Sequence, residues 1–345
     1  MNVNVDSKIA LITGTTSNLG INIAYRLLEK IPASDHLTLI VTSRTLPKAK
    51  QVIETINNHF IKYHGDRIGK LEFDYILVDF SDMVSVLSTF YELNKKYSRI
   101  DYLFINAAQG VYSGINWPQA FVEIFKNPVE GVTNPTYKTQ RVGVKSSDGL
   151  GLVFQANVFG PFYLVHKCKD LLKGGKVIWI SSIMANPKYL SFLDLQLLRS
   201  PEPYEGSKRL VDLLHIGTYK KFNAQYGIKE YVVHPGIFTS FSFFQFLNFF
   251  TYYGMILLFY IARLLGSRYH NISGYTAANA PISCAFNDED QSYKICSQSD
   301  RLGREYLARE EIDATGAEDV VHYFEELCKE WDDKLKNQIV STRQP

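Results

Sequence analysis

Short apolar runs alternate with longer amphipathic stretches along the first two thirds of the chain. The runs of strand length occupy residues 8–13, 37–42, 73–78, 101–106, 176–181 and 230–234. Stretches with the period of a helix occupy residues 19–30, 47–63, 85–97, 152–172 and 204–226. Strands that are apolar almost throughout, separated by helices, are typical of a parallel sheet covered on both faces. The pattern predicts one α/β domain over residues 1–345, built on a doubly wound parallel sheet of the Rossmann-like kind.

Three segments are longer than a connection between neighbouring elements requires, namely 109–148, 183–203 and 238–266. Each follows the carboxyl end of a predicted strand, which is the edge where open α/β sheets bind ligands. Long insertions in compact domains usually carry function. We therefore expect all three on the substrate side of the domain.

The last part of the chain is less regular. Residues 287–315 show no pattern that places the final strand of the sheet. Residues 316–341 have the period of a charged helix, with an apolar stripe of Val320, Tyr323, Phe324 and Leu327. We expect this C-terminal helix to pack on the outside of the domain, with binding of a partner as the alternative.

Composition narrows the class of protein. The chain carries 37 Lys and Arg against 35 Asp and Glu, so its net charge of +2 gives no reason to expect a nucleic-acid partner. Its four cysteines are scattered and its histidines do not cluster, which argues against a disulfide framework and against a metal site. The first apolar strand begins near Lys8, too early for a secretory signal to precede it. We therefore expect the catalytic part to face the cytosol.

The first predicted strand runs into a helix through residues 13–20, Thr-Gly-Thr-Thr-Ser-Asn-Leu-Gly. Small residues and glycines at a helix N-terminus let backbone amides approach a pyrophosphate, whose charge the helix dipole favours. The alternative is an ordinary strand-to-helix turn, because the pattern departs from GxGxxG. On the first interpretation, the residues that bind a dinucleotide here are Gly14, Thr16, Asn18, Leu19 and Gly20.

The end of the second strand indicates which dinucleotide is bound. It reads Thr42, Ser43 and Arg44. Folds that prefer NAD usually place an acid here for the ribose 2′-hydroxyl, whereas a guanidinium suits the 2′-phosphate of NADP. Arg44 therefore predicts NADPH as the cofactor, with a solvated loop arginine as the alternative.

Tyr204 and Lys208 stand one helical turn apart and are candidates for acid–base chemistry. The same spacing recurs at Tyr91 and Tyr163, but only Tyr204 follows a strand, 176–181, whose end carries adjacent hydroxyls. Reduction of a ketone requires a hydride at carbon and a proton at oxygen. We expect Lys208 to lower the pKa of the phenol and Ser182 to hold the substrate oxygen while Tyr204 delivers the proton.

These motifs, taken in order, resemble the short-chain dehydrogenase/reductase superfamily over residues 8 to about 240. They are the turn at 13–20, Asn-Ala-Ala at 106–108, Asn157, the serine pair at 181–182, Tyr204 with Lys208, and His-Pro-Gly at 234–236. The resemblance implies a catalytic tetrad of Asn157, Ser182, Tyr204 and Lys208. It also implies that Lys208 contacts the nicotinamide ribose and that Asn157 joins a proton relay through water. Further cofactor contacts implied by the resemblance are Asp79, Asn106, Tyr204, Ile237 and Thr239.

The chain departs from the pattern of this superfamily in two places, and two assignments stay open. Asn18 replaces a glycine, so side-chain hydrogen bonds there would hold the pyrophosphate turn. Ser182 precedes Tyr204 by 22 residues, so the insertion at 183–203 must loop out without moving either group. Either Ser181 or Ser182 can be the acting serine, and Ser240 is an alternative to Thr239 at the cofactor amide.

A narrower resemblance, to the fungal 3-keto-steroid reductases of ergosterol biosynthesis, extends over nearly the whole chain. It is carried by the segments TSRTLPKA, INAAQGVY, NPTYKTQRVGVKS, ISSIMANPKYLS and HPGIFTSFSF. It implies that the substrate is the C3 ketone of a C4-demethylated sterol, reduced with NADPH to the 3β-alcohol. The alternatives are a reductase of another lipid ketone, such as a retinoid, and a scaffold that binds other sterol-biosynthetic enzymes.

Residues 241–262 contain no charged side chain and are crowded with aromatic and aliphatic ones. Three interpretations stay open: a helix that spans a bilayer, a buried pair of core helices, and an apolar substrate flap over 237–290 that dips into a lipid surface. The third is the one we favour. With the resemblance, it places the protein on the cytosolic face of the endoplasmic reticulum membrane and on lipid droplets.

Overall fold

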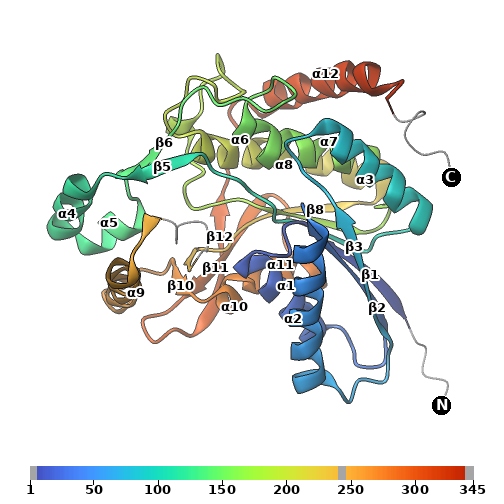
Figure 1. Ribbon diagram of the computed structural model, residues 1–345, viewed down its shortest axis with the longest axis horizontal. Coiled ribbons are helices and arrows are strands. Elements are labelled where there is room, and N and C mark those ends of the chain that lie inside the picture. Colours follow the sequence, from blue (N-terminus) through green and yellow to red (C-terminus); the bar gives the residue numbers. More distant parts are fainter. Residues whose placement is uncertain (1–5, 240–245, 339–345) are drawn as a thin grey trace.

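The computed structural model describes residues 6–239 and 246–338, with a central sheet of eight strands in the order β12-β11-β8-β7-β4-β1-β2-β3 (Figure 1). All neighbours are parallel except β11 and β12. The doubly wound fold expected from the apolar runs is confirmed. The strands are β1 (Ser7–Ile12), β2 (His36–Ser43), β3 (Leu71–Leu77), β4 (Tyr102–Ile105), β7 (Lys176–Ile180), β8 (Lys229–His234), β11 (Tyr293–Ser299) and β12 (Glu305–Glu311).

Helices cover both faces of this sheet and bury a separate core on each (Figure 1). One face carries α1 (Asn18–Lys30), α2 (Leu46–His64), α10 (Gly274–Ala277) and α11 (Asn279–Phe286). The other carries α3 (Met83–Lys96), α6 (Leu152–Phe154), a π-helix (Gln155–Phe159), α7 (Gly160–Lys167), α8 (Pro203–Tyr226) and α12 (Ala317–Leu335). The apolar stripe of α12 packs against α8, with Val320 and Phe324 fully buried. Residues 339–341 of the expected C-terminal helix lie outside the described residues.

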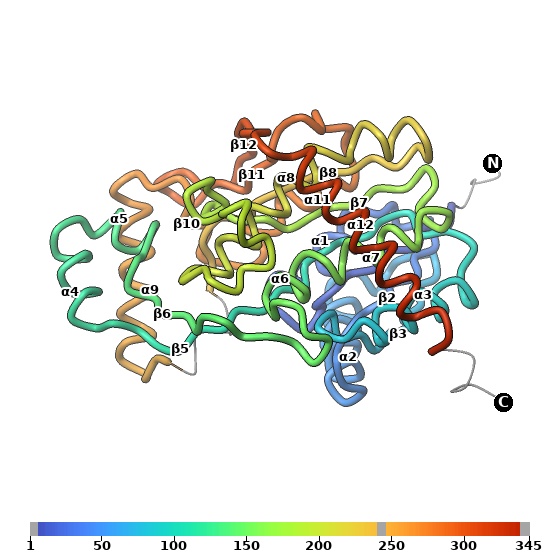
Figure 2. Tube along the Cα trace, turned by 90° about the horizontal axis from the view of Figure 1, so that it is seen from above, coloured from blue at the N-terminus to red at the C-terminus, as the bar shows by residue number. Residues whose placement is uncertain are grey.

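The insertion at 109–148 has secondary structure of its own and stands beyond one end of the sheet (Figures 1 and 2). It forms a hairpin of β5 (Tyr112–Ile115) and β6 (Lys138–Gln140), joined by α4 (Trp117–Lys126) and α5 (Pro128–Thr133). Helix α9 (Phe249–Leu264) packs against α5 around a small core that contains Val132 and Phe259. We call α4, α5 and α9 together the apolar lobe.

The segment expected to form a flap, 237–290, divides into two parts. Its first half holds the short strands β9 (Ile237–Phe238) and β10 (His270–Ile272) and the exposed helix α9. Its second half is not a flap, because Ala280, Ile282 and Cys284 of α11 are buried in the core beneath the sheet. The alternative of a buried helix pair is wrong for the described part of 241–262, since Phe249 and Phe250 are exposed; residues 241–245 lie outside the described range.

The remaining long insertion, 183–203, packs on the first turn of α8 instead of extending into solvent. It contains one short 3-10 turn, Pro187–Tyr189. A Cβ at Gly206 would come within 2.7 Å of Tyr189 O and 2.6 Å of Leu197 Cδ2. The glycine therefore lets this insertion close over α8 beside Tyr204.

Candidate active site

The turn between β1 and α1 holds two glycines against neighbouring backbone at the helix N-terminus. Gly14 has φ +63, and a Cβ there would lie 2.8 Å from Ala107 Cα. A Cβ at Gly20 would lie 2.5 Å from Gly14 O, so both glycines are needed for the close approach of turn and helix. The first turn of α1 carries no acid. This arrangement fits the pyrophosphate of a dinucleotide.

Side chains brace this turn from below. Thr42 is buried; its Oγ1 accepts the Gly14 amide at 2.8 Å and donates to Ile12 O. Asn106 Nδ2 donates to Thr13 O at 2.9 Å and to Gly14 O at 3.0 Å. Leu19 belongs to the core beneath α1, while Thr16 lies on the half-exposed side of the turn. Three of the residues expected to bind the cofactor therefore support the turn from its buried side: Thr42, Asn106 and Leu19.

Asn18 ties the turn to the segment after β8. Its Nδ2 donates to Thr239 O at 2.7 Å and to Thr239 Oγ1 at 3.3 Å, and its Oδ1 accepts from Asn22. The expectation that side-chain hydrogen bonds hold the turn at Asn18 therefore agrees with this geometry. Ile237 begins β9, two residues before Thr239, and is half-buried. Ser240, the alternative to Thr239, lies outside the described residues.

The ends of β2 and β3 reach the same edge of the sheet. Ser43 is buried, and its Oγ accepts the Thr45 amide at 3.3 Å, whereas Arg44 is exposed beyond it. Asp79 follows β3, and its Oδ1 accepts from the amide and the hydroxyl of Ser81. An exposed guanidinium at this edge of the sheet fits the 2′-phosphate of NADP.

Tyr204 and Lys208 face each other at the start of α8. Lys208 Nζ lies 5.6 Å from the centroid of the Tyr204 ring and donates to Ile180 O at 2.8 Å. Among the described residues the phenol hydroxyl has no hydrogen-bond partner. It is therefore free to meet a substrate oxygen.

The electrostatics of this pair differ from the expectation. Burial, and after it the Glu205 carboxylate, raise the pKa of Tyr204 above its usual value. Burial lowers the pKa of Lys208 to about 8, with Asp212 acting in the opposite direction. The prediction that Lys208 lowers the phenol pKa is therefore wrong: the ammonium donates to Ile180 O instead of the phenol, and burial sets the direction of the Tyr204 shift. A raised pKa keeps the proton on the phenol at neutral pH.

Of the two serines, Ser182 is the one placed to act. Ser181 is 3% exposed, and its hydroxyl donates to Asp212 Oδ1 at 2.6 Å. Ser182 is half-buried at the end of β7; its Oγ accepts the Met184 amide at 3.1 Å, and its proton has no acceptor among the described residues. The geometry therefore favours Ser182 as a donor to a substrate oxygen.

Asn157 sits in the π-helix, a distortion that is frequent at functional sites. It is 2% exposed, and its side chain exchanges two hydrogen bonds with the backbone of Gln109. Its Nδ2 also donates to Ser207 Oγ at 3.0 Å, which in turn donates to Tyr204 O. Asn157 thus joins the end of β4 to the helix that carries Tyr204.

Comparison with known proteins agrees with this ordered set of motifs. Residues 8–243 match the family model described as short chain dehydrogenase. The chain belongs to the short-chain dehydrogenase family. The matched range ends at residue 243, before helix α9 and the last two strands of the central sheet.

Two relatives of this dehydrogenase match along their full length. A 3-keto-steroid reductase of Debaryomyces hansenii is 68% identical, covering 99% of this chain and 99% of the relative. A 3-keto-steroid reductase of Candida albicans is 65% identical, again covering 99% of each. The solved structure of YwfH, an NADPH dependent reductase involved in bacilysin biosynthesis, has a TM-score of 0.56 at 15% identity and covers 87% of this chain and 99% of that chain. At that identity the likeness shows the fold alone.

Sequence reasoning missed several residues around the site of this dehydrogenase. Asp212, one turn beyond Lys208, forms a buried ion pair with Lys294 of β11, and Lys294 Nζ lies 3.4 Å from Ser182 O. Gln140 of β6 bonds the first turn of α8. These contacts join segments that are far apart in the sequence, so no spacing pattern indicated them.

Proposed function

We propose that the protein is an NADPH-dependent 3-keto-steroid reductase, which converts the C3 ketone of C4-demethylated sterol intermediates to the 3β-alcohol in ergosterol biosynthesis. The observation that carries the proposal is full-length identity of 68% to a relative of that name. The arrangement of Tyr204, Lys208 and Ser182 supplies the chemistry that such a reaction requires. NADPH, when bound along the β1–α1 turn, would supply the hydride.

Tyr204 acts as the proton donor in this proposal. Its raised pKa means that the phenol enters the reaction protonated. As the substrate oxygen gains negative charge, the Ser182 hydroxyl donates to it and the phenol gives up its proton. Lys208, whose pKa of about 8 leaves it mostly charged at neutral pH, lies 5.6 Å from the centroid of the ring that gives up this proton. Asn157 holds the first turn of α8 in place through Ser207. In this proposal it also takes part in the proton relay through water.

Arg44 supports the choice of NADPH over NADH. It is exposed at the edge where the adenine ribose of a dinucleotide would lie, and no described acid pairs with it. Asp79 stands at the neighbouring strand end, beside the expected adenine. The cofactor contacts proposed for Gly14, Thr16, Asn18 and Gly20 rest on the close glycine turn at the N-terminus of α1 described above.

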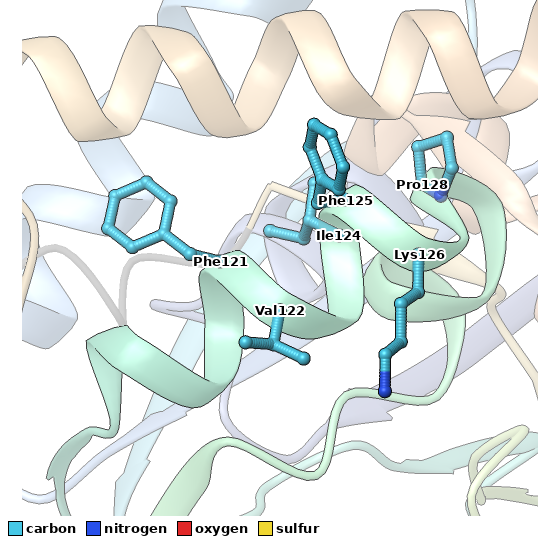
Figure 3. A pocket seen from close by; sticks show the side chains of 6 residues that line it. All are labelled: Phe121, Val122, Ile124, Phe125, Lys126 and Pro128. Atoms are coloured by element: carbon cyan, nitrogen blue, oxygen red, sulfur yellow. The ribbon is translucent and has the colours of Figure 1, made fainter.

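We further propose that the apolar lobe contacts a lipid surface, on the cytosolic face of the endoplasmic reticulum or on lipid droplets. Phe125 is 92% exposed, Phe250 82% and Phe121 71%. An open apolar hollow of about 590 Å³ lies on α4 and the start of α5, lined by Phe121, Val122, Ile124, Phe125, Lys126 and Pro128 (Figure 3). Helix α9 carries Arg263 as its one charged residue. Among the described residues, no helix is both long and apolar enough to cross a membrane.

Product analysis tests the proposed reaction. The purified protein is incubated with NADPH and 3-keto-sterols, and the alcohol is identified by chromatography and mass spectrometry against 3α and 3β standards. We expect the 3β-alcohol, formed with NADPH far faster than with NADH. A protein that leaves 3-keto-sterols unchanged but reduces retinal would refute the proposed substrate.

Vesicle flotation tests the lipid contact. Burial of an exposed phenylalanine contributes about 2 kcal/mol, so Phe125→Ser with Phe250→Ser should weaken partitioning by about 4 kcal/mol, close to a thousandfold. The matched control is Ile68→Ser, because Ile68 is 88% exposed outside the lobe. Equal flotation of the lobe variant and the control would contradict the proposal.

A further inference from the structure

Helix α8 begins with an amide that its own sequence leaves without an acceptor. Its N-cap residue, Glu202, makes no side-chain bond to the helix, and the next residue, Pro203, has no N–H. The first unsatisfied amide is therefore that of Tyr204. Gln140 Oε1, from the inserted hairpin, accepts this amide at 3.2 Å. The helix cap at the candidate proton donor is thus supplied by a distant segment.

The other end of the same side chain holds the neighbouring carboxylate. Gln140 Nε2 donates to Glu205 Oε2 at 2.7 Å. Glu205 is 7% exposed, and a buried carboxylate costs free energy unless it is hydrogen-bonded. One amide therefore fixes both the backbone of Tyr204 and the charge beside its phenol.

Tyr112 completes the contact from the facing strand. It pairs with Gln140 directly across the hairpin. Its ring centroid lies 5.9 Å from that of Tyr204, with the planes tilted by 46°. A ring at this distance restricts the motion of the Tyr204 ring. We call Tyr112 and Gln140 the hairpin clamp.

The hairpin clamp belongs to an insertion that the central sheet does not need. Within residues 6–239 and 246–338, strands β5 and β6 pair only with each other. The end of the hairpin remote from the clamp continues into α4 through the cap residue Asn116. We infer that this inserted hairpin positions the catalytic tyrosine for proton delivery, with Gln140 as its principal positioning residue. The inference rests on the proposed role of Tyr204 as proton donor.

Gln140→Met tests the inference, because it keeps the length of the side chain and removes both hydrogen bonds. The matched control is Thr139→Val, which removes the bond between Thr139 and Ser113 from the same hairpin without touching Tyr204. Turnover, NADPH affinity, melting temperature and the solvent isotope effect on kcat are measured for both variants and the wild type. Because a misplacement of about 1 Å in a catalytic group can lower the rate about a hundredfold, we expect kcat to fall roughly tenfold to a hundredfold for Gln140→Met.

The expected signature is a loss confined to the proton step. For Gln140→Met, kcat falls and the solvent isotope effect rises, while KM and the Kd of NADPH stay within about twofold of wild type; Thr139→Val behaves like wild type. Equal kcat values for the two variants, or a fall in kcat matched by equal losses of NADPH affinity, would overturn the inference. Should Gln140→Met not fold, Tyr112→Leu, which leaves Gln140 in place, must show the same separation of kcat from Kd.

Failure of the proposed function gives a different result. The variant-to-wild-type ratios are taken on whichever ketone the wild type reduces. A wild type that rejects 3-keto-steroids but reduces another ketone refutes the substrate, and the ratios still decide the role of the hairpin clamp. A wild type that reduces no ketone overturns both.

Discussion

Glu230 is expected to make the stability of the fold decrease as pH rises. Its side chain lies on β8, 1% exposed, where its carboxylate accepts Trp179 Nε1–H at 2.6 Å and Thr218 Oγ1–H at 2.8 Å. Burial raises its pKa from the ordinary value of 4.5 to about 7, and the two hydrogen bonds only partly oppose this. No described cation is among its partners.

The sign and size of the effect follow from proton binding. Between pH 4.5 and about 7 the folded chain holds the Glu230 proton, while the unfolded chain has released it. Stability from this group is therefore full below pH 4.5 and is lost as pH rises through about 7. At 1.36 kcal/mol for each tenfold difference in proton affinity, the loss is about 3 kcal/mol.

Glu230→Gln should remove this dependence. The Gln oxygen can accept from Trp179, and its amide can donate to Thr218 Oγ1, whose own proton then goes to Leu214 O at 2.7 Å. In urea denaturation, we expect the variant to match wild type near pH 4.5 and to exceed it by up to about 3 kcal/mol at pH 8. Glu54→Gln, an exposed substitution on α2, is the control. A difference between Glu230→Gln and wild type that does not change with pH would refute the reasoning.

Two substitutions test the cofactor groove. Gly14→Ala places a Cβ 2.8 Å from Ala107 Cα at φ +63, a strain of about 1–3 kcal/mol, so the Kd of NADPH should rise at least about tenfold in a fluorescence titration; tight binding would contradict the assignment of the turn. Arg44→Asp should weaken NADPH roughly a hundredfold and leave NADH within a few-fold, since two charge-assisted hydrogen bonds to the 2′-phosphate are lost. Equal losses for the two dinucleotides would count against Arg44.

Local patterns were sufficient to predict the first six strands of the central sheet, but not β5 and β6 of the inserted hairpin. Strands β1 to β4, β7 and β8 contain short apolar runs separated by stretches of helical period, so their positions were visible in the sequence. Strand β11 was not predicted, because Lys294, Ser297 and Gln298 are buried in it. Ser297 Oγ donates to Ala277 O at 2.8 Å. No local sequence pattern predicts such a bond to a distant backbone carbonyl.

The residues of the candidate site could be predicted from the sequence, but the directions of their pKa shifts could not. The motif spacing placed Tyr204 beside Lys208, and the structure brings them together. The direction of the Tyr204 pKa depends on burial and on Glu205, which only the packed structure contains. Gln140 and Lys294 act across segments that meet only in the fold, so their contacts could not be read from the chain.

Tyr204→Phe is the most direct test of the account, since it deletes only the hydroxyl proposed to protonate the substrate oxygen. We predict that turnover of a 3-keto-sterol falls at least about a hundredfold, in line with the usual contribution of a general acid, while the Kd of NADPH and the melting temperature stay at wild-type values. Turnover within a few-fold of wild type, with NADPH bound equally well, would contradict the account.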